Sequence, residues 1–186
     1  FLQFIKIIYK NNFGRFVIYI SLISMATAIA SPFFAVYMLK SLNFSYKTYT
    51  IITISHMFTS LIFMPVWGRF SDKYGNLKTI KICGFLVPLI PFLWLASPII
   101  LSYSKFLLIV YLAVVEAFSG FAWSGFNLAS GNFIYDAVTR QRMALCIAYF
   151  NITNTLGGFI GATLGGFLAS YNFSIFGLVP LLAIFL

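Results

Sequence analysis

The sequence "WGRFSDKYGNLKTIK", residues 67–81, concentrates the charge of this chain. Its charged residues are Arg69, Asp72, Lys73, Lys78 and Lys81. The whole chain holds only 12 lysines and arginines and three aspartates and glutamates, so a third of its charged side chains lie in this stretch. Long apolar runs flank the stretch on both sides. A short charged segment between two apolar runs indicates a loop between two membrane-spanning helices.

The composition of the chain excludes a soluble protein. Hydrophobic residues make up 61% and charged residues 8% of the 186 residues, whereas soluble domains contain about 25% charged residues. The formal net charge is +9, but the cations lie in short loops and form no basic face for nucleic acid. We interpret them as charges that contact lipid headgroups and orient the protein in the bilayer.

Six apolar segments are predicted to span the membrane as helices, because a span requires about 20 mostly apolar residues. None shows the strict polar–apolar alternation of barrel strands. The segments cover residues 16–39, 49–67, 82–97 (with 101 as an alternative end), 106–129, 144–169 and a last one from about 174 that is cut off at 186. We therefore expect an all-α integral membrane protein with a six-helix bundle over residues 16–186. We also expect a longer native chain, because the sequence starts at Phe1 rather than at methionine and ends in an apolar run.

The basic residues are distributed unequally between the two sides that these segments define. One side holds nine and the other three, and the excess predicts which side is cytoplasmic. The nine are Lys6, Lys10, Arg15, Arg69, Lys73, Lys78, Lys81, Arg140 and Arg142, and the three are Lys40, Lys47 and Lys105. We therefore expect a multi-pass protein of the plasma membrane with a cytoplasmic N-terminus.

Residues 1–15 form a separate segment before the first span. Gln3, Lys6 and Lys10 fall on one helical face and apolar residues on the other, which is typical of an amphipathic helix lying on the inner leaflet. Either a linker between two halves of a larger protein or an ordinary juxtamembrane segment would have this pattern.

Glu116 is the most informative polar residue, because it lies near the middle of the fourth segment. A charge at that depth costs about 2.5–3.5 kcal/mol on insertion scales, and burial favours the neutral, protonated form of a carboxyl group. No basic residue is found within another span to pair with it. Glu116 is therefore interpreted as a site of proton or cation coupling or of contact with a cationic substrate, with a neutral packing residue as the alternative.

Other polar side chains form stripes on the first, second, fourth and fifth segments, whereas the third and sixth are predicted to face lipid. His56 on the second segment is either a titrating group or a helix–helix hydrogen-bonding residue, and Trp123 either lines a cavity or packs. The candidates for substrate or ion coupling are Glu116, Trp123, Asn127, Asn151, Asn154 and His56.

Glycines recur at four-residue intervals in the fifth segment, at Gly157, Gly161 and Gly165, with Gly166 beside the last. Such small-residue ladders allow two membrane helices to approach closely. We expect these glycines to pack against another helix, on a smooth surface that would also suit two bundles that slide or rock.

The opening stretch resembles a signature of the major facilitator superfamily. Gly68-Arg-Phe-Ser-Asp72-Lys73-Tyr-Gly75 is similar to the family's G-x-x-x-D-[RK]-x-G pattern between the second and third helices of each half, although Asn76 and Leu77 stand where two basic residues are usual. The glycines of the fifth segment resemble that family's fifth-helix motif, with Ala162 where proline is common. Asp136 followed by Arg140 and Arg142 resembles the loop that enters that helix.

The resemblance covers essentially the whole chain and implies a six-helix half of a twelve-helix major facilitator fold, most similar to the C-terminal half of bacterial members. It implies that helices one and four line the cavity, and that two and five meet the missing N-terminal half. The implied function is secondary active transport of a small solute by alternating access, coupled to a proton or another ion.

The signature also suggests a gating contact on the cytoplasmic side. Asp72 can accept charge-assisted hydrogen bonds from Arg140 or Arg142, and Gly68 and Gly75 are expected to allow tight backbone turns around it. We expect this latch to close when the transporter faces outward and to open when it faces inward. The predicted gating residues are Gly68, Asp72, Lys73, Gly75, Arg140 and Arg142.

Other functions find less support in the sequence. An enzyme would need a catalytic cluster, and the sequence contains no HExxH, GxSxG or Walker motif. A non-transporting membrane scaffold or partner subunit remains the alternative, although the costly Glu116 argues against it. Cys83 and Cys146 are interpreted as packing residues, so we predict no metal and no cofactor other than a coupling proton or sodium ion.

Overall fold

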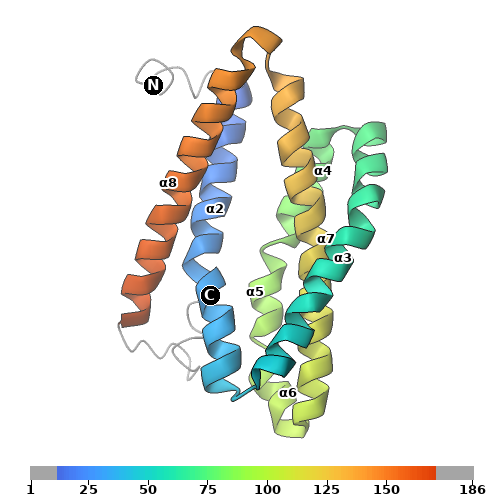
Figure 1. Ribbon diagram of the computed structural model, residues 1–186, viewed down its shortest axis with the longest axis vertical. Helices are drawn as coiled ribbons and strands as arrows, with labels where there is room; N and C mark the ends of the chain where they lie inside the picture. Colours follow the sequence, from blue (N-terminus) through green and yellow to red (C-terminus); the bar gives the residue numbers. More distant parts are fainter. Residues whose placement is uncertain (1–11, 171–186) are drawn as a thin grey trace. The chain divides into compact units, whose positions relative to one another are not determined.

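The computed structural model of the chain describes residues 12–170, which are almost entirely helical (Figure 1). Strands are absent from these residues. The elements are α2 (Asn12–Val36), the π-helix η2 (Tyr37–Ser41), α3 (Tyr46–Tyr74), α4 (Asn76–Leu86), α5 (Leu89–Trp94), α6 (Ser97–Tyr103), α7 (Lys105–Ala137), the 3₁₀-helix η3 (Arg140–Arg142) and α8 (Met143–Ser170).

Five helical stretches are long and apolar enough to cross a membrane. They are Asn12–Ser41, Tyr46–Tyr74, Asn76–Trp94, Lys105–Ala137 and Arg140–Ala169. They coincide with the first five predicted segments, so the prediction of an all-α membrane bundle is confirmed for the described residues. The predicted sixth segment and residues 1–11 of the predicted lead-in lie outside them.

The third segment differs from the single helix that its apolar composition predicts. It is divided into α4, α5 and α6, with breaks next to Pro88 and Pro98. Proline has no backbone N–H and clashes with the preceding turn, so a helix tends to end or bend beside it. The segment buries one face, where Cys83 and Trp94 are completely buried, and exposes Phe85 and Phe92 on another, so its contact with lipid stays a prediction.

The described residues divide into two compact units. One contains residues 12–34 and 131–170, which include most of α2 and all of α8, and the other contains residues 35–130 with α3 to α6 and most of α7. Each unit has its own packing, and each is described by itself below.

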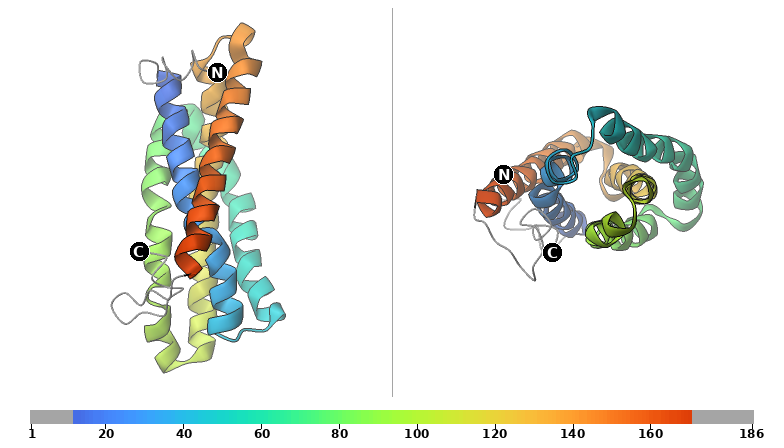
Figure 2. Two further views of the ribbon diagram at one scale, coloured as in Figure 1. Left: turned by 90° about the vertical axis from the view of Figure 1, so that its left-hand side faces the viewer. Right: turned by 90° about the horizontal axis from the view of Figure 1, so that it is seen from below.

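In the first unit, α2 and α8 lie side by side in both views of the chain (Figures 1 and 2). Ser21 Oγ donates a hydrogen bond to the carbonyl oxygen of Thr153 at 2.8 Å. The ring of Phe16 near the start of α2 stacks on the ring of Phe150 with a centroid distance of 5.8 Å. Polar and aromatic contacts therefore both join the first half of each helix.

Glycines let these two helices meet backbone to backbone. A Cβ atom added to Gly157 would lie 2.5 Å from the carbonyl oxygen of Ser21, and one added to Gly165 would lie 2.5 Å from that of Ile29. A Cβ on Gly161, between them, would overlap the carbonyl oxygen of Met25. Only glycine fits such a close approach. Lipid tails are as apolar as the side chains, so the hydrophobic effect does not join helices in a membrane, and dense packing of this kind stabilises the pair instead. A Cβ atom added to Gly166 would meet no atom within 4 Å in the described part of the chain, so the expected packing of Gly166 against another helix stays a prediction.

In the second unit, one end of the bundle is held by contacts around Tyr37. Its hydroxyl group lies 2.9 Å from Ser97 Oγ, and its ring meets the Trp94 ring edge to face. Tyr111 Oη on α7 donates to the carbonyl oxygen of Leu93 at 2.7 Å. The carbonyl group of Leu93, next to one break in the third segment, thus has a partner on a neighbouring helix, as irregular backbone within a membrane requires.

Candidate functional site

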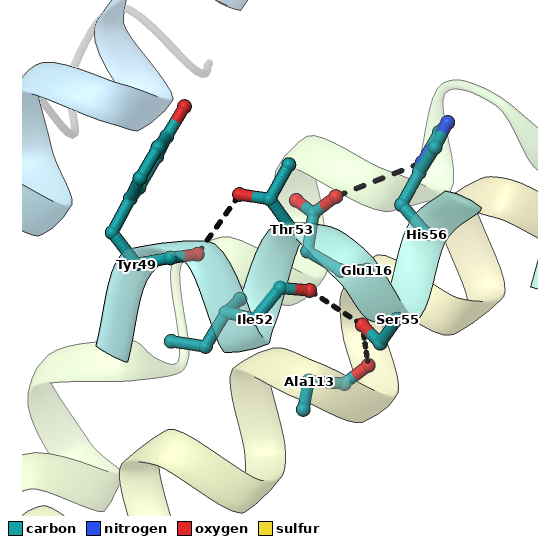
Figure 3. A network of polar contacts seen from close by, with 7 residues as sticks. All are labelled: Tyr49, Ile52, Thr53, Ser55, His56, Ala113 and Glu116. Atoms are coloured by element: carbon teal, nitrogen blue, oxygen red, sulfur yellow. Dashed lines mark hydrogen bonds and ion pairs between the residues drawn. The ribbon is translucent and has the colours of Figure 1, made fainter. Parts of the chain in front are cut away.

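The candidate site lies where α3 and α7 cross in the second unit (Figure 3). Ser55 Oγ lies 2.8 Å from the carbonyl oxygen of Ala113 on α7 and 2.6 Å from that of Ile52 on its own helix. Its single proton is shared between these two acceptors. Because Ala113 lies on the neighbouring helix, this hydroxyl group fixes the register of α3 against α7.

The next residue of α3 forms the histidine–glutamate contact of the site. His56 Nδ1 lies 3.7 Å from Glu116 Oε2, and Figure 3 shows the two side chains pointing toward one another from their separate helices. The Glu116 side chain is 16% exposed and that of His56 32%. The carboxyl group of Glu116 is therefore mostly buried, while the imidazole group of His56 is partly exposed at the surface of the helices.

A glycine one turn beyond Glu116 brings the two helices together at this point. A Cβ atom on Gly120 would overlap the carbonyl oxygen of His56 and would lie 2.9 Å from its carbonyl carbon. The backbone of α3 therefore rests directly on the surface of α7. This approach allows the short glutamate side chain to reach the imidazole group.

Tryptophan contacts continue the same interface beyond the pair. Trp67 Nε1 donates a hydrogen bond to the carbonyl oxygen of Phe121 at 2.8 Å. A Cβ atom on Gly125 would lie 2.6 Å from both Cys83 Sγ on α4 and the Trp67 ring. Three helices thus pack closely between the pair and the end of α3, and this packing holds α3 and α7 in a defined position.

The His56–Glu116 contact corrects the expectation that no basic residue is available within the spans to pair with Glu116. The position of His56 in its segment predicts either a titrating group or a helix–helix hydrogen-bonding residue, but it does not connect His56 with Glu116. The signal was present, since His56 is the single histidine of the chain and Glu116 is its single glutamate. What was missing was the contact between their helices.

The other four predicted coupling residues lie on α7 and α8, two on each helix. Trp123 and Asn127 follow Glu116 on α7 in the second unit, where the Trp123 ring contacts Phe126 edge to face at 5.6 Å. Asn151 and Asn154 lie on α8 in the first unit, and Asn154 Oδ1 is buried without a hydrogen-bond partner among residues 12–170. Of the six candidates, the structure brings His56 and Glu116 together within one unit.

The predicted gating residues surround the end of α3 and the start of α8. Gly75 ends α3 with a φ of 89°, a conformation that favours glycine, and this agrees with the expected turn. The expectation for Gly68 is wrong, because Gly68 lies inside α3 and makes an ordinary contact with Leu128 at 3.8 Å. Asp72 is exposed on one unit and Arg140 and Arg142 are exposed on the other, so their pairing stays a prediction.

No group of histidine, cysteine, aspartate and glutamate side chains that could hold a metal ion occurs within the described residues. Within the described part of the second unit, the acid–base side-chain pair inside the apolar helices is His56 with Glu116. An arrangement of two proton-binding groups on adjacent helices can take up and release protons without a metal ion.

Apolar helices of spanning length, two of which are joined by a histidine–glutamate contact, define a multi-pass, all-α integral membrane protein. Residues 16–186 match the Major Facilitator Superfamily, so the chain belongs to this family of membrane transporters. Comparison with curated proteins and with solved structures gives no match. The protein is therefore a transporter embedded in the lipid bilayer, and members of its family carry small molecules and are not enzymes.

Proposed function

We propose that the chain forms one half of a secondary active transporter that moves a small solute by alternating access, coupled to the movement of a proton. The observation that carries the proposal is the His56–Glu116 contact of 3.7 Å within the spans. Acidic and basic side chains inside membrane spans are costly and are usually retained for a function such as proton relay. Imidazole is the side chain whose ordinary pKa lies nearest to neutral pH.

The pair can exchange protons for a simple electrostatic reason. A protonated His56 and an ionised Glu116 neutralise one another, so the ion pair is tolerated where a lone charge would be costly. Adding a proton to the carboxylate leaves an uncompensated positive charge, and removing one from the imidazolium leaves a negative charge. Either change alters the balance between conformations that expose the pair to different sides of the membrane.

The remaining parts of the proposal follow from the family and from the charge distribution. Transporters of this family contain two repeated halves, and access alternates as one half rocks against the other around a midplane site. A second half would complete the substrate site, and we place this half in the plasma membrane with a cytoplasmic N-terminus because of its basic loops. The coupling ion in this proposal is a proton, and sodium is the competing choice.

The proposal is tested with the full-length natural protein in proteoliposomes that contain a pH-sensitive dye. Candidate solutes are added, and the internal pH is followed with and without a protonophore. We expect a transported solute to move protons, and the protonophore to abolish its accumulation. A solute that accumulates without proton movement, or only with a sodium gradient, would contradict proton coupling. Absence of transport across a broad solute panel, from a protein that is folded and inserted, would favour the scaffold alternative.

Replacing Asp72 by asparagine is expected to slow transport while leaving membrane insertion intact. In the proposed latch the carboxylate accepts hydrogen bonds from Arg140 or Arg142, and a hydrogen bond to a charged group contributes about 1.5–3 kcal/mol. Its loss should shift the balance between inward and outward states by about tenfold to a hundredfold. Uptake rate and surface expression are measured together, with Asp72→Glu as the control that keeps the charge. Uptake by Asp72→Asn at the wild-type rate would exclude the latch.

A further inference from the structure

A cluster of basic residues surrounds the turn between α3 and α4, and neither the coupling site nor the latch accounts for all of it. We define the basic turn as Arg69, Lys73, Tyr74, Lys78 and Lys81. All five side chains are exposed. Asp72 is the single acidic residue of this stretch, and no ion pair joins it to these cations within residues 12–170.

Hydrogen bonds hold the turn in one conformation. The N–H group of Gly75 donates to the carbonyl oxygen of Ser71 at 2.8 Å, and Ser71 Oγ donates to the side chain of Asn76 across the turn. Thr79 Oγ1 donates to the carbonyl oxygen of Gly75 at 3.3 Å. The last turn of α3 and the first turn of α4 are therefore held next to one another, and so are the cations that they carry.

Two of these cations contact the aromatic ring of Tyr74. Lys73 Nζ lies 5.1 Å from the ring centroid and Lys78 Nζ lies 4.6 Å from it. Cation–π attraction holds each ammonium group near the ring, although the two groups repel one another. An anion that reaches this point would be attracted by both groups at once and would relieve their repulsion.

We propose that the basic turn binds the phosphate group of an anionic membrane lipid. The turn joins two helices that are each long and apolar enough to span the bilayer, so it lies at the level of the headgroups. Each lysine or arginine close to an anionic membrane surface strengthens binding by about fivefold. A tyrosine such as Tyr74, with 46% of its surface exposed, suits the boundary between acyl chains and headgroups. The occupant is therefore a lipid, whose acyl chains would lie along α3 and α4.

The proposal is tested by native mass spectrometry of the full-length protein in detergent, titrated with phosphatidylglycerol or phosphatidylcholine of the same acyl chains. We expect phosphatidylglycerol to bind more tightly. The variant Lys78→Gln/Lys81→Gln should weaken its binding by about 25-fold, fivefold for each cation removed. The matched control Lys40→Gln/Lys47→Gln removes the same charge outside the basic turn and should change binding by less than about twofold, because salt screens distant charges.

Two further variants separate the arrangement of the cations from their number. Tyr74→Ala leaves every cation in place and should still weaken lipid binding by about twofold to fivefold, whereas Tyr74→Phe keeps the ring and should bind as the wild type does. Equal binding of the two lipids, or equal weakening by the two double variants, would overturn the proposal. Equally tight binding of soluble glycerol phosphate would also overturn it, since the site would then recognise a free anion rather than a lipid. These readouts do not depend on transport, so the lipid site and the proposed function stand or fall separately.

Discussion

Replacing Glu116 by glutamine is expected to reduce transport driven by a pH gradient by about 100-fold or more, the range seen when a positioned proton-transfer group is lost. Glutamine keeps the size of glutamate and can still form hydrogen bonds, but it cannot gain or lose a proton. The His56–Glu116 pair would therefore lose the step that links proton movement to the change of access. The measurement is solute accumulation in proteoliposomes across a series of imposed pH gradients.

A double-mutant cycle shows whether His56 and Glu116 act together in transport. If the two side chains act together across their 3.7 Å contact, then His56→Gln combined with Glu116→Gln should be no worse than Glu116→Gln alone. Thr53→Val is a suitable control, because Thr53 lies close by on α3 but bonds to the carbonyl oxygen of Tyr49 in its own helix. Wild-type pH dependence in Glu116→Gln would make Glu116 a packing residue and would remove the basis for proton coupling.

Replacing Gly161 by alanine is expected to destabilise the pairing of α2 with α8 by about 1–3 kcal/mol, the usual cost of overpacking. The added methyl group would overlap the carbonyl oxygen of Met25 and lie 3.0 Å from Ala28 Cβ. A backbone carbonyl group cannot move aside as a long side chain can, so the whole helix would have to shift. Thermal unfolding of the detergent-solubilised protein measures this loss.

Gly166→Ala is the matched control for this change. A Cβ atom added to Gly166 would have no atom within 4 Å among the described residues, so the added methyl group meets no obstacle there. Alanine favours a helix over glycine by about 1 kcal/mol, and the control should therefore be as stable as the wild type or slightly more so. If both variants unfold at the wild-type temperature, the backbone contact at Gly161 does not stabilise the protein.

Much of the fold could be predicted because it depends on local composition. A stretch of about 20 apolar residues has few alternatives to a helix in lipid, since every backbone polar group must be satisfied internally. This reasoning located the five described spans. It did not locate the break of the third span beside Pro88, because proline is also tolerated within membrane helices and its effect depends on which neighbours satisfy the freed carbonyl groups.

The helix ends were also less predictable than the helices themselves. Charged residues after Trp67 suggested that the second span ends there, yet α3 continues to Tyr74 and ends at Gly75. A helix can extend from the apolar core into the headgroup layer with its charged side chains exposed, and its end is then set by a residue such as Gly75 that adopts a positive φ. Gly68 is also a glycine, but it lies inside α3 and is therefore not at a turn.

Sequence alone determines that this is a membrane protein of the major facilitator type, because apolar length, charge clusters and the spacing of Gly68, Asp72 and Gly75 are properties of neighbouring residues. It also singles out Glu116, because a carboxyl group in an apolar segment is unusual wherever the helix lies. Only the tertiary structure decides that His56 is its partner. Their helices meet because Gly120 lets the α3 backbone approach α7 and because Ser55 bonds across to Ala113. Such contacts join residues far apart in the chain, and their energy exists only once the helices have packed.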